Sequence, residues 1–214
     1  HVMHAGDMEY VMPQLIWHLE DLRVGQSYPN YYIARLASKF VKVVLSGGGG
    51  DELFAGYPWR YYRGIEAADT NEYYQGYYDY WQRLIPDEDR PQFFNAATYQ
   101  HVKDYRPIDT FRSVFARRQP AINTSEDVVN ASLYFEISTF LHGLFVVEDK
   151  LSMAHSLETR VPFMDNDLVD FAMRIPPRYK LRDLEIAPYV DEDEVGKLAK
   201  YRRQGTSDGK IILR

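Results

Sequence analysis

The pattern of hydrophobic and polar positions predicts one short strand set among helices. Residues 41–45, VKVVL, are β-branched and almost continuous in apolar character, which is typical of a parallel strand buried on both faces. Two helices are predicted before the strand, one beginning at Pro13 and one beginning near Pro29. The order of helix, strand, glycine loop and helix favours an α/β sheet.

Beyond residue 57 the hydrophobic pattern predicts helices, and no alternating strand pattern is evident there. Five apolar residues at helical spacing predict one core helix: Leu133, Ile137, Phe140, Leu141 and Leu144. Another helix is predicted from Asp165 or Asn166 up to the proline pair at residues 176–177, and a short amphipathic helix over residues 191–201. We therefore expect a helix-dominated chain, with a strand-bearing part at residues 1–57 and a helical part at residues 58–214.

Composition limits the classes of function. The net charge of -6 argues against capture of nucleic acid through phosphate contacts, which need a basic face. The chain has no cysteine, which excludes disulfides, thiolate catalysis and cysteine-ligated zinc. No apolar run approaches the ~20 residues of a membrane span, and we expect a cytoplasmic protein. Because the sequence ends inside the apolar run GKIILR, we also expect an interior piece of a longer protein.

The predicted strand leads directly into a glycine loop, SGGGGDE, at residues 46–52. Consecutive glycines let the backbone turn sharply and approach a ligand, and their N–H groups can form an anion-binding nest. The loop lacks the lysine of a Walker loop, and Glu52 stands where a dinucleotide-binding loop has its third glycine. Carboxylates beside phosphates need a cation between them, and Mg²⁺ held by Asp51 or Glu52 would supply it. The alternative is a glycine turn followed by a helix-capping aspartate.

A second segment, EDKLSMAHSLETRVPF at residues 148–163, is rich in charge but follows the most apolar predicted helix. A solvated helix face is the common explanation for such a run. Here apolar residues alternate with the charges, so several charges are expected to lie near a core and to need partners. The predicted ionic network consists of Asp149, Lys150, Glu158 and Arg160. Lys150 could reach a phosphate, and Arg160 could hold a carboxylate with two hydrogen bonds.

The other candidates have ordinary explanations. His142 and His155 are not at metal-ligand spacing and are interpreted as structural histidines. The tyrosines within residues 57–80 could stack on nucleobases, but helix packing explains them better in an acidic chain. Glu20 and Asp21 could add an acidic contribution to a metal site, although a solvated pair is the default.

Two long strings, in this order, resemble the asparagine synthase family. VKVVLSGGGGDELFAGY is similar to the family segment VVLSGEGADELFGGY. EDKLSMAHSLETRVPFMDNDLVDFAMRIPP is similar to the family segment DKMSMAHSLEVRVPFLDHRLVEFAMSLPP. The similarity covers most of the chain and is weakest over residues 66–125.

This resemblance implies an ATP-dependent ligase. In the family, a synthetase domain adenylates aspartate with ATP, releases pyrophosphate and lets ammonia attack the β-aspartyl-AMP. A glutaminase domain at the N-terminus of the parent chain supplies the ammonia from glutamine. The family's primary phosphate loop, SGGLDSS, is absent from this sequence. The chain is therefore expected to hold part of a PP-loop ATP pyrophosphatase-like sheet and to be inactive by itself, with ATP and Mg²⁺ as cofactors of the whole protein.

The family pattern also implies roles for individual residues. Asp51, Lys150 and Glu158 are expected to be catalytic, and Asp51 and Glu52 to hold Mg²⁺. ATP or pyrophosphate is expected to contact Ser46, Gly47, Gly48, Gly49, Gly50 and Glu52. Asp149, Arg160 and Tyr57 are expected to bind substrate or to support the site. The resemblance implies no contact with nucleic acid or membrane, and it leaves a homodimer open.

One departure from the family pattern bears on the substrate. The family commonly has glutamate two residues after the loop serine, a position that contacts the reacting groups, whereas this chain has Gly48. Relatives with the same ATP chemistry form other amides, including β-lactam rings and peptide macrocycles. An amidotransferase or cyclase acting on another acid therefore stays open, as does a non-catalytic binding module of the same fold.

Overall fold

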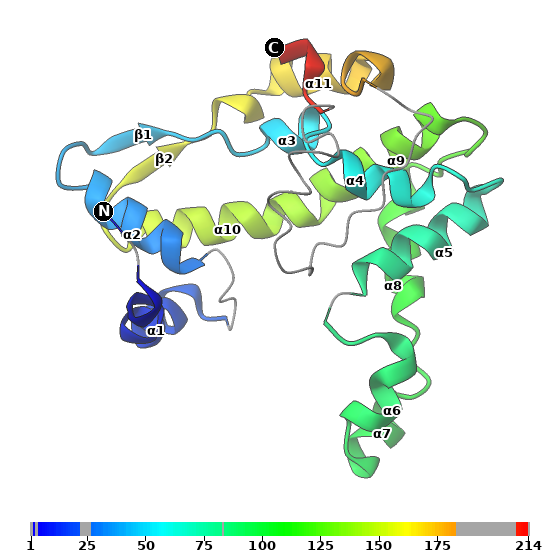
Figure 1. The fold of residues 1–214 in the computed structure, drawn as a ribbon, viewed down its shortest axis with the longest axis horizontal. Helices are drawn as coiled ribbons and strands as arrows, with labels where there is room; N and C mark the ends of the chain where they lie inside the picture. The colour runs from blue at the N-terminus through cyan, green and yellow to red at the C-terminus, as the bar shows by residue number, and fades with distance from the viewer. Residues whose placement is uncertain (1, 3, 22–26, 83, 183–208, 214) are drawn as a thin grey trace. The chain divides into compact units, whose positions relative to one another are not determined.

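The computed structural model describes residues 2, 4–21, 27–82, 84–182 and 209–213 (Figure 1). The contacts divide the chain into two units. The first unit contains the chain up to Gly50 together with Thr139–Phe171, and the second contains Asp51–Ser138 and the chain from Ala172 onward. The sequence pattern placed a boundary at residue 57 instead and assigned everything after it to one helical part. In the structure, residues 139–171 belong to the first unit, because they contain the second strand of its sheet.

The first unit holds a two-stranded parallel sheet between β1 (Val43–Leu45) and β2 (Glu158–Arg160). Val43 pairs with Glu158, and Leu45 pairs with Arg160. Among the described residues this unit contains α1 (Ala5–Leu19), α2 (Ser27–Ala37), α10 (Phe140–Met153) and the first part of α11 (Asn166–Arg174), and α10 contacts α1, α2 and β2. The expectation of a helix-dominated chain with a small parallel sheet is confirmed. The prediction of no strand beyond residue 57 is wrong, because β2 has only three residues, Glu, Thr and Arg, and shows no alternation of apolar and polar positions.

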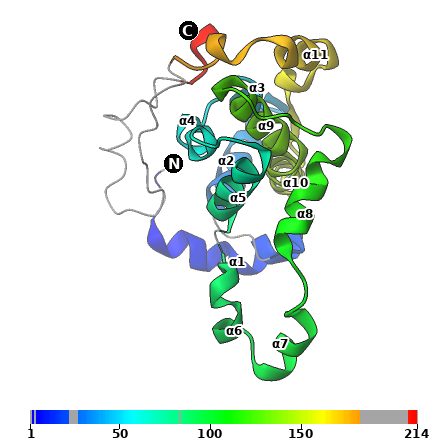
Figure 2. The same ribbon diagram turned by 90° about the vertical axis from the view of Figure 1, so that its right-hand side faces the viewer.

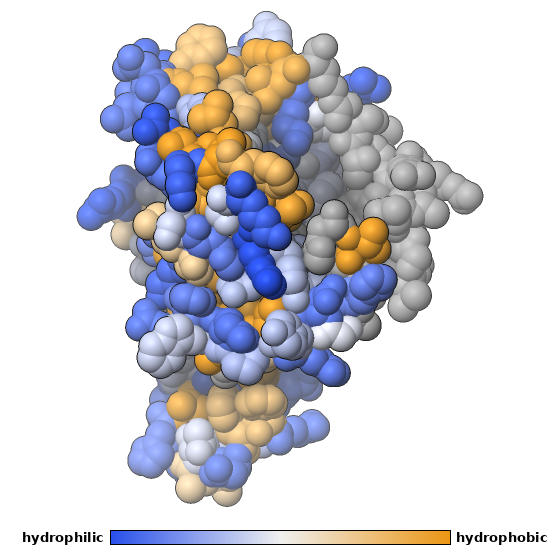
Figure 3. All heavy atoms as spheres, turned by 90° about the vertical axis from the view of Figure 1, so that its left-hand side faces the viewer, coloured by the Kyte–Doolittle hydropathy of each residue, from blue (hydrophilic) through white to orange (hydrophobic). Residues whose placement is uncertain are grey.

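The prediction that residues 41–45 are buried on both faces is also wrong. Val43 is 40% exposed and Leu45 is 74% exposed, whereas Val44 between them is half-buried. The strand therefore alternates, with one face turned toward helices and the other turned away from them. Figure 3 shows hydrophobic residues among hydrophilic ones on the face of the molecule that it draws.

Helix α1 begins eight residues before the predicted start at Pro13, which lies inside it. The helix begins at Ala5 because the Asp7 carboxylate accepts a hydrogen bond from the backbone N–H of His4, at 2.7 Å. This contact satisfies a donor that a helix start leaves without a partner. Apolar side chains of α1 then form a buried cluster with α2 and α10, made of Val11, Leu15, Leu19, Tyr32 and Leu151.

The predicted helix through Leu133 and Leu144 is two helices in the structure. Helix α9 (Ser125–Ser138) belongs to the second unit and α10 to the first, and Thr139 between them leaves the helical region with φ -128° and ψ -67°. Leu133 is buried in one unit and Leu141 in the other. The apolar spacing therefore continues across the break and cannot reveal it.

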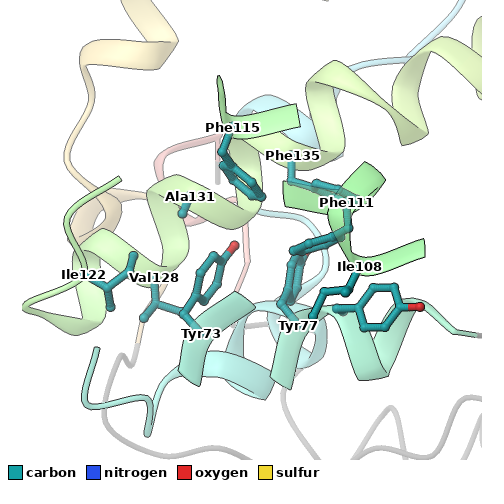
Figure 4. Close-up of a cluster of buried hydrophobic side chains, with 10 residues drawn as sticks. Tyr73, Tyr77, Ile108, Phe111, Phe115, Ile122, Val128, Ala131 and Phe135 are labelled. Carbon is teal, nitrogen blue, oxygen red and sulfur yellow. The ribbon is translucent and has the colours of Figure 1, made fainter. Parts of the chain in front are cut away.

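The second unit is an assembly of short helices around an aromatic core. Its remaining elements are α4 (Pro58–Tyr61), α5 (Thr70–Trp81), α6 (Arg90–Phe93), α7 (Ala96–Val102) and α8 (Pro107–Ser113), and α3 (Gly50–Leu53) leads into it. Tyrosines of α5 pack against phenylalanines of α8 and α9, and the rings of Tyr73 and Tyr77 are stacked with centroids 5.5 Å apart (Figure 4). Helices α6 and α7 lie at the far end of this unit from α9 (Figures 1 and 2). These tyrosines pack between helices, as the sequence interpretation favoured.

Helix α11 (Asn166–Arg174) follows the predicted signals closely. An Asp165 carboxylate oxygen accepts hydrogen bonds from the backbone N–H groups of Asp167 and Leu168, at 3.1 and 3.2 Å, and the helix ends before the proline pair. The predicted helix over residues 191–201 lies outside the described residues. Within the described parts of the chain, every helix is too short or too polar to cross a membrane.

Candidate functional site

The glycine loop leaves β1 at Ser46 and is held by its own hydrogen bonds. The Ser46 N–H donates to the carbonyl of Arg160 on β2, at 2.8 Å, so the sheet pairing extends one residue into the loop. The Ser46 hydroxyl oxygen accepts from the N–H of Gly48 at 3.1 Å, and the Gly50 N–H donates to the carbonyl of Gly47 at 3.2 Å. The loop is a tight turn at the carboxyl end of a parallel strand, where α/β proteins place ligands.

The loop glycines differ in how closely their surroundings approach them. Gly49 has φ +89°, a conformation that favours glycine, and a Cβ atom there would overlap the Met164 side chain. At Gly50 a Cβ atom would lie 3.1 Å from the Phe163 ring. Gly47 differs, because no heavy atom lies within 4 Å of a Cβ atom placed there. Gly47 is therefore the point at which the loop backbone faces open space.

A cavity of about 350 Å³ lies beside the start of this loop, within the first unit. Ser46 and the strand residues Val44 and Thr159 line one side of it, and α2 and α10 line the other. The polar residues around it are Asn30, Ser46, Glu148, Ser152 and Thr159, among apolar side chains of α2. A mostly apolar pocket with a few polar groups is the usual form of a small-molecule site.

Glu148 lines this cavity, and the sequence interpretation did not assign it a role. It lies on α10, is half-buried, and lines the cavity together with Ser46. A Cβ atom placed at Gly48 would lie 3.2 Å from the Oε2 atom of Glu148 and 2.9 Å from the ring of Phe145. The signal that could have found it is its position directly before Asp149 in the second family-like segment.

In the second unit, Asp51 forms an ion pair with Lys210. The Lys210 Nζ atom lies 2.6 Å from an Asp51 carboxylate oxygen, and each side chain is about one-third exposed. The Lys210 N–H donates to the carbonyl of Phe54 at 3.0 Å, which fixes the lysine backbone beside α3. Gly56 approaches so closely that a Cβ atom there would overlap the Asp51 carboxylate. Asp51 thus presents an accessible carboxylate beside a cation, and the sequence interpretation missed Lys210.

Glu52 points into the core of the second unit. It is only 1% exposed, and its Oε1 atom accepts a hydrogen bond from the Tyr57 hydroxyl at 2.9 Å. Burial raises the pKa of the Glu52 carboxyl, and burial also raises the pKa of the Tyr57 hydroxyl. Of the two residues expected to hold a metal, Asp51 is partly exposed although it is paired with Lys210, whereas Glu52 is buried against a phenol.

A buried charge pair, Arg60 and Glu136, belongs to the same unit. The Arg60 guanidinium lies 3.6 Å from the Glu136 carboxylate and 3.9 Å from the centre of the Tyr57 ring. The Tyr77 hydroxyl donates to Glu136 at 2.9 Å, and burial raises the pKa of Glu136 to about 7 although Arg60 opposes the shift. Arg60 also acts electrostatically on Glu52. The charges of this cluster, absent from the sequence interpretation, interact electrostatically with Glu52, the residue that follows Asp51.

The predicted network of Asp149, Lys150, Glu158 and Arg160 is divided into separate contacts. Lys150 donates to the Glu20 carboxylate at 2.8 Å and to the Leu19 carbonyl at 2.9 Å, where α1 ends. This hydrogen bond lowers the pKa of Glu20. Arg160 donates to Glu158 at 2.8 Å on β2, where both side chains are more than half exposed, and Asp149 is exposed on α10.

No set of three His, Asp or Glu side chains among the described residues converges as a metal site. Mg²⁺ in phosphate-binding sites is held by one or two carboxylates and by the phosphates themselves. Asp51 fits such a role by its accessibility and its place after the glycine loop.

Comparison with known proteins gives the family. A family model described as "Asparagine synthase" matches residues 1–214. A protein of Bacillus subtilis named asparagine synthetase [glutamine-hydrolyzing] 1 is 32% identical over 196 residues, which cover 80% of this chain and 31% of that protein. A second relative, from Mycobacterium bovis, is 30% identical over 204 residues, which cover 84% of this chain and 31% of the relative.

The chain thus spans about a third of the length of the curated relatives that it matches. The match runs through both structural units and includes the glycine loop, its following carboxylates and the charged segment after α10. The chain belongs to the asparagine synthase family.

Proposed function

We propose that this chain forms part of an ATP-dependent ligase that activates the side-chain carboxyl group of aspartate and converts it to an amide. The observation that carries the proposal is the glycine loop, which leaves a parallel strand at Ser46, faces open space at Gly47 and runs directly into Asp51. The relatives' name, asparagine synthetase [glutamine-hydrolyzing], supports the same reaction class. In the full-length protein, ammonia would come from glutamine through a glutaminase domain.

The reaction needs an aspartate carboxylate to attack the α-phosphorus of ATP, so that pyrophosphate leaves with the electrons of the broken P–O bond. Ammonia then attacks the acyl carbon and AMP leaves. Positioning and charge stabilisation provide most of the catalysis in such steps. Loop N–H groups at Gly47 would contact phosphate oxygens. In the second unit, the Lys210 ammonium would neutralise negative charge beside Asp51. Mg²⁺ bound at Asp51 would supply further neutralisation of the phosphates.

Glu52 has a different part in this proposal. Its carboxylate is buried against Tyr57 and near Arg60, so it would fix the backbone that presents Asp51 rather than bind metal directly. Lys150 likewise acts at a distance from the phosphates in this view, because its ammonium group holds the end of α1. In this proposal, Asp51 alone would bind Mg²⁺.

A second candidate function is amide formation on another acid. The observation that favours it is Gly48, which stands where the family commonly has glutamate near the reacting groups. Both candidates predict ATP–pyrophosphate exchange, and they differ in the acid that supports it. A binding module without catalysis predicts no exchange with any acid.

The test is ATP–pyrophosphate exchange by the full-length protein, with a panel of amino-acid carboxylates. Exchange that depends on aspartate, together with asparagine formation from added ammonium chloride, is the expected result. Exchange with a different acid alone would select the second candidate. The absence of exchange throughout the panel, in a protein shown to be folded, would refute ligase activity.

A further inference from the structure

The loop position that carries glutamate in the family motif has no side chain in this chain, yet a carboxylate lies beside it. A Cβ atom at Gly48 would meet Oε2 of Glu148 at 3.2 Å and the Ser46 hydroxyl oxygen at 3.4 Å. Glu148 comes from α10, about a hundred residues later in the sequence, and belongs to the same structural unit as the loop. Its carboxylate therefore occupies the neighbourhood that a loop side chain would enter.

The surroundings of Glu148 are those of a ligand-facing group. It is half-buried and lines the cavity of about 350 Å³ with Ser46, Asn30 and Thr159. Phe145, one helical turn earlier on α10, lies against Gly48 and closes the space that a loop side chain would need. The helix thus both excludes a side chain at position 48 and brings a carboxylate to the same place.

We propose that Glu148 supplies, from α10, the carboxylate that the family motif carries at position 48. The proposal rests on the proposed ligase function. As ammonia attacks the acyl carbon of the activated acid, its nitrogen gives its lone pair to the new C–N bond and becomes positively charged. The Glu148 carboxylate takes the excess proton from that nitrogen, and AMP leaves with the electron pair of the broken C–O bond.

A glutamate at position 48 and the glutamate at position 148 cannot both fit beside the loop, which gives the proposal a direct test. A glutamate at position 48 would collide with Phe145 and would place a second carboxylate beside Glu148, and like charges this close disfavour one another. The variant Gly48→Glu should therefore lose activity, although it restores the family residue. The triple variant Gly48→Glu/Phe145→Ala/Glu148→Ala should be more active than the double variant Phe145→Ala/Glu148→Ala, because the carboxylate returns and both the ring and the competing charge are gone.

The principal experiment separates the two half-reactions in the full-length protein. Acid-dependent ATP–pyrophosphate exchange reports adenylation, and amide formation with ammonium chloride reports the nitrogen transfer without the need for glutamine. Glu148→Gln is expected to keep exchange within about threefold and to lose about 100-fold or more in amide formation, the usual effect of removing a general base. The matched control is Glu9→Gln, an exposed glutamate on α1, which should change neither rate.

The outcomes distinguish this proposal from the proposed function. Wild-type protein without exchange on any acid refutes the ligase function and this role with it. Wild-type exchange together with unimpaired amide formation by Glu148→Gln refutes the role of Glu148 alone, as does an equal loss in both half-reactions. If Glu148→Gln melts at a lower temperature, Glu148→Asp decides: partial amide formation in that stable variant supports the proposal, and none overturns it.

Discussion

Replacement of single loop glycines by alanine should separate the loop's structural needs from its ligand contacts. Gly49 has φ +89°, and a non-glycine residue in this region costs about 1–2 kcal/mol. An alanine Cβ atom there would also displace the Met164 side chain, and an off-rotamer side chain costs about 0.5–1.5 kcal/mol. We therefore expect Gly49→Ala to lower the free energy of unfolding by about 1.5–3.5 kcal/mol.

Gly47 is the matched control within the same loop. Its φ lies outside the left-handed region and a Cβ atom would meet no heavy atom within 4 Å, so Gly47→Ala should leave stability unchanged or raise it by up to about 1 kcal/mol. Urea unfolding followed by tryptophan fluorescence measures both variants. The added methyl group at position 47 should instead lower ATP–pyrophosphate exchange, because it fills the space in which phosphate would approach the backbone.

A third variant separates the two contributions at position 49. Asparagine tolerates the left-handed region better than alanine does but keeps the contact with Met164. Gly49→Asn should therefore recover part of the stability that Gly49→Ala loses. Equal stability of Gly49→Ala and Gly47→Ala would refute the reasoning from φ and from the Met164 contact together.

Three further predictions concern charged groups. Asp51→Asn in the full-length protein should lower ATP–pyrophosphate exchange and weaken inhibition by magnesium pyrophosphate, and normal exchange in that variant would remove Asp51 from the site. The pKa of Glu136 is about 7 in the folded protein and 4.5 in the unfolded reference, so the protonated carboxyl stabilises the fold fully below pH 4.5. This stabilisation is lost as the pH rises through 7. Urea unfolding across this range should show a fall of about 3 kcal/mol in the free energy of unfolding, and Glu136→Gln should abolish that fall. Lys150→Gln should raise the pKa of Glu20, as followed by NMR titration, and an unchanged pKa would contradict the hydrogen bond between them.

Local signals in the sequence were sufficient where the structure depends on local contacts. The aspartate and the proline pair that bound α11 act through hydrogen bonds and backbone restrictions within a few residues, and the helix follows them. The glycine loop is similar, because its shape follows from residues 46–50 and the strand before it. The start of α1 depends on an equally local signal, Asp7 three residues after His4, but Pro13 also fits the first position of a helix and predicts a later start.

Long-range pairing accounts for the larger errors. Glu158 and Arg160 lie on a strand only because β1 is available as a partner. The three polar residues of β2 show no alternation of apolar and polar positions that would predict a strand. The same holds for the break at Thr139, where each flanking helix finds a core in a different unit. A periodic pattern reports that a face is buried but not which partner buries it.

The site residues divide in the same way. The family-like strings pointed to Ser46 and Asp51, which the structure leaves accessible, but motif order could not show that Glu52 turns inward. Arg60 and Glu136 are 76 positions apart in the sequence, and only the folding of the second unit brings the two charges together. Contacts between residues far apart in the sequence leave no pattern in the sequence that would predict them. The approach of Glu148 to Gly48 is a second example.

The two strands of the small sheet differ in how they are protected against other chains. Within the described residues β1 hydrogen-bonds with β2 alone, so each strand has an edge that could template intermolecular pairing. On the outer face β2 carries the charged pair Glu158 and Arg160, which opposes stacking of a second copy, whereas β1 carries Val43 and Leu45. Aggregation of this chain, when it is produced in isolation, should therefore begin at β1, and a lysine in place of Leu45 is the substitution to make first for soluble expression.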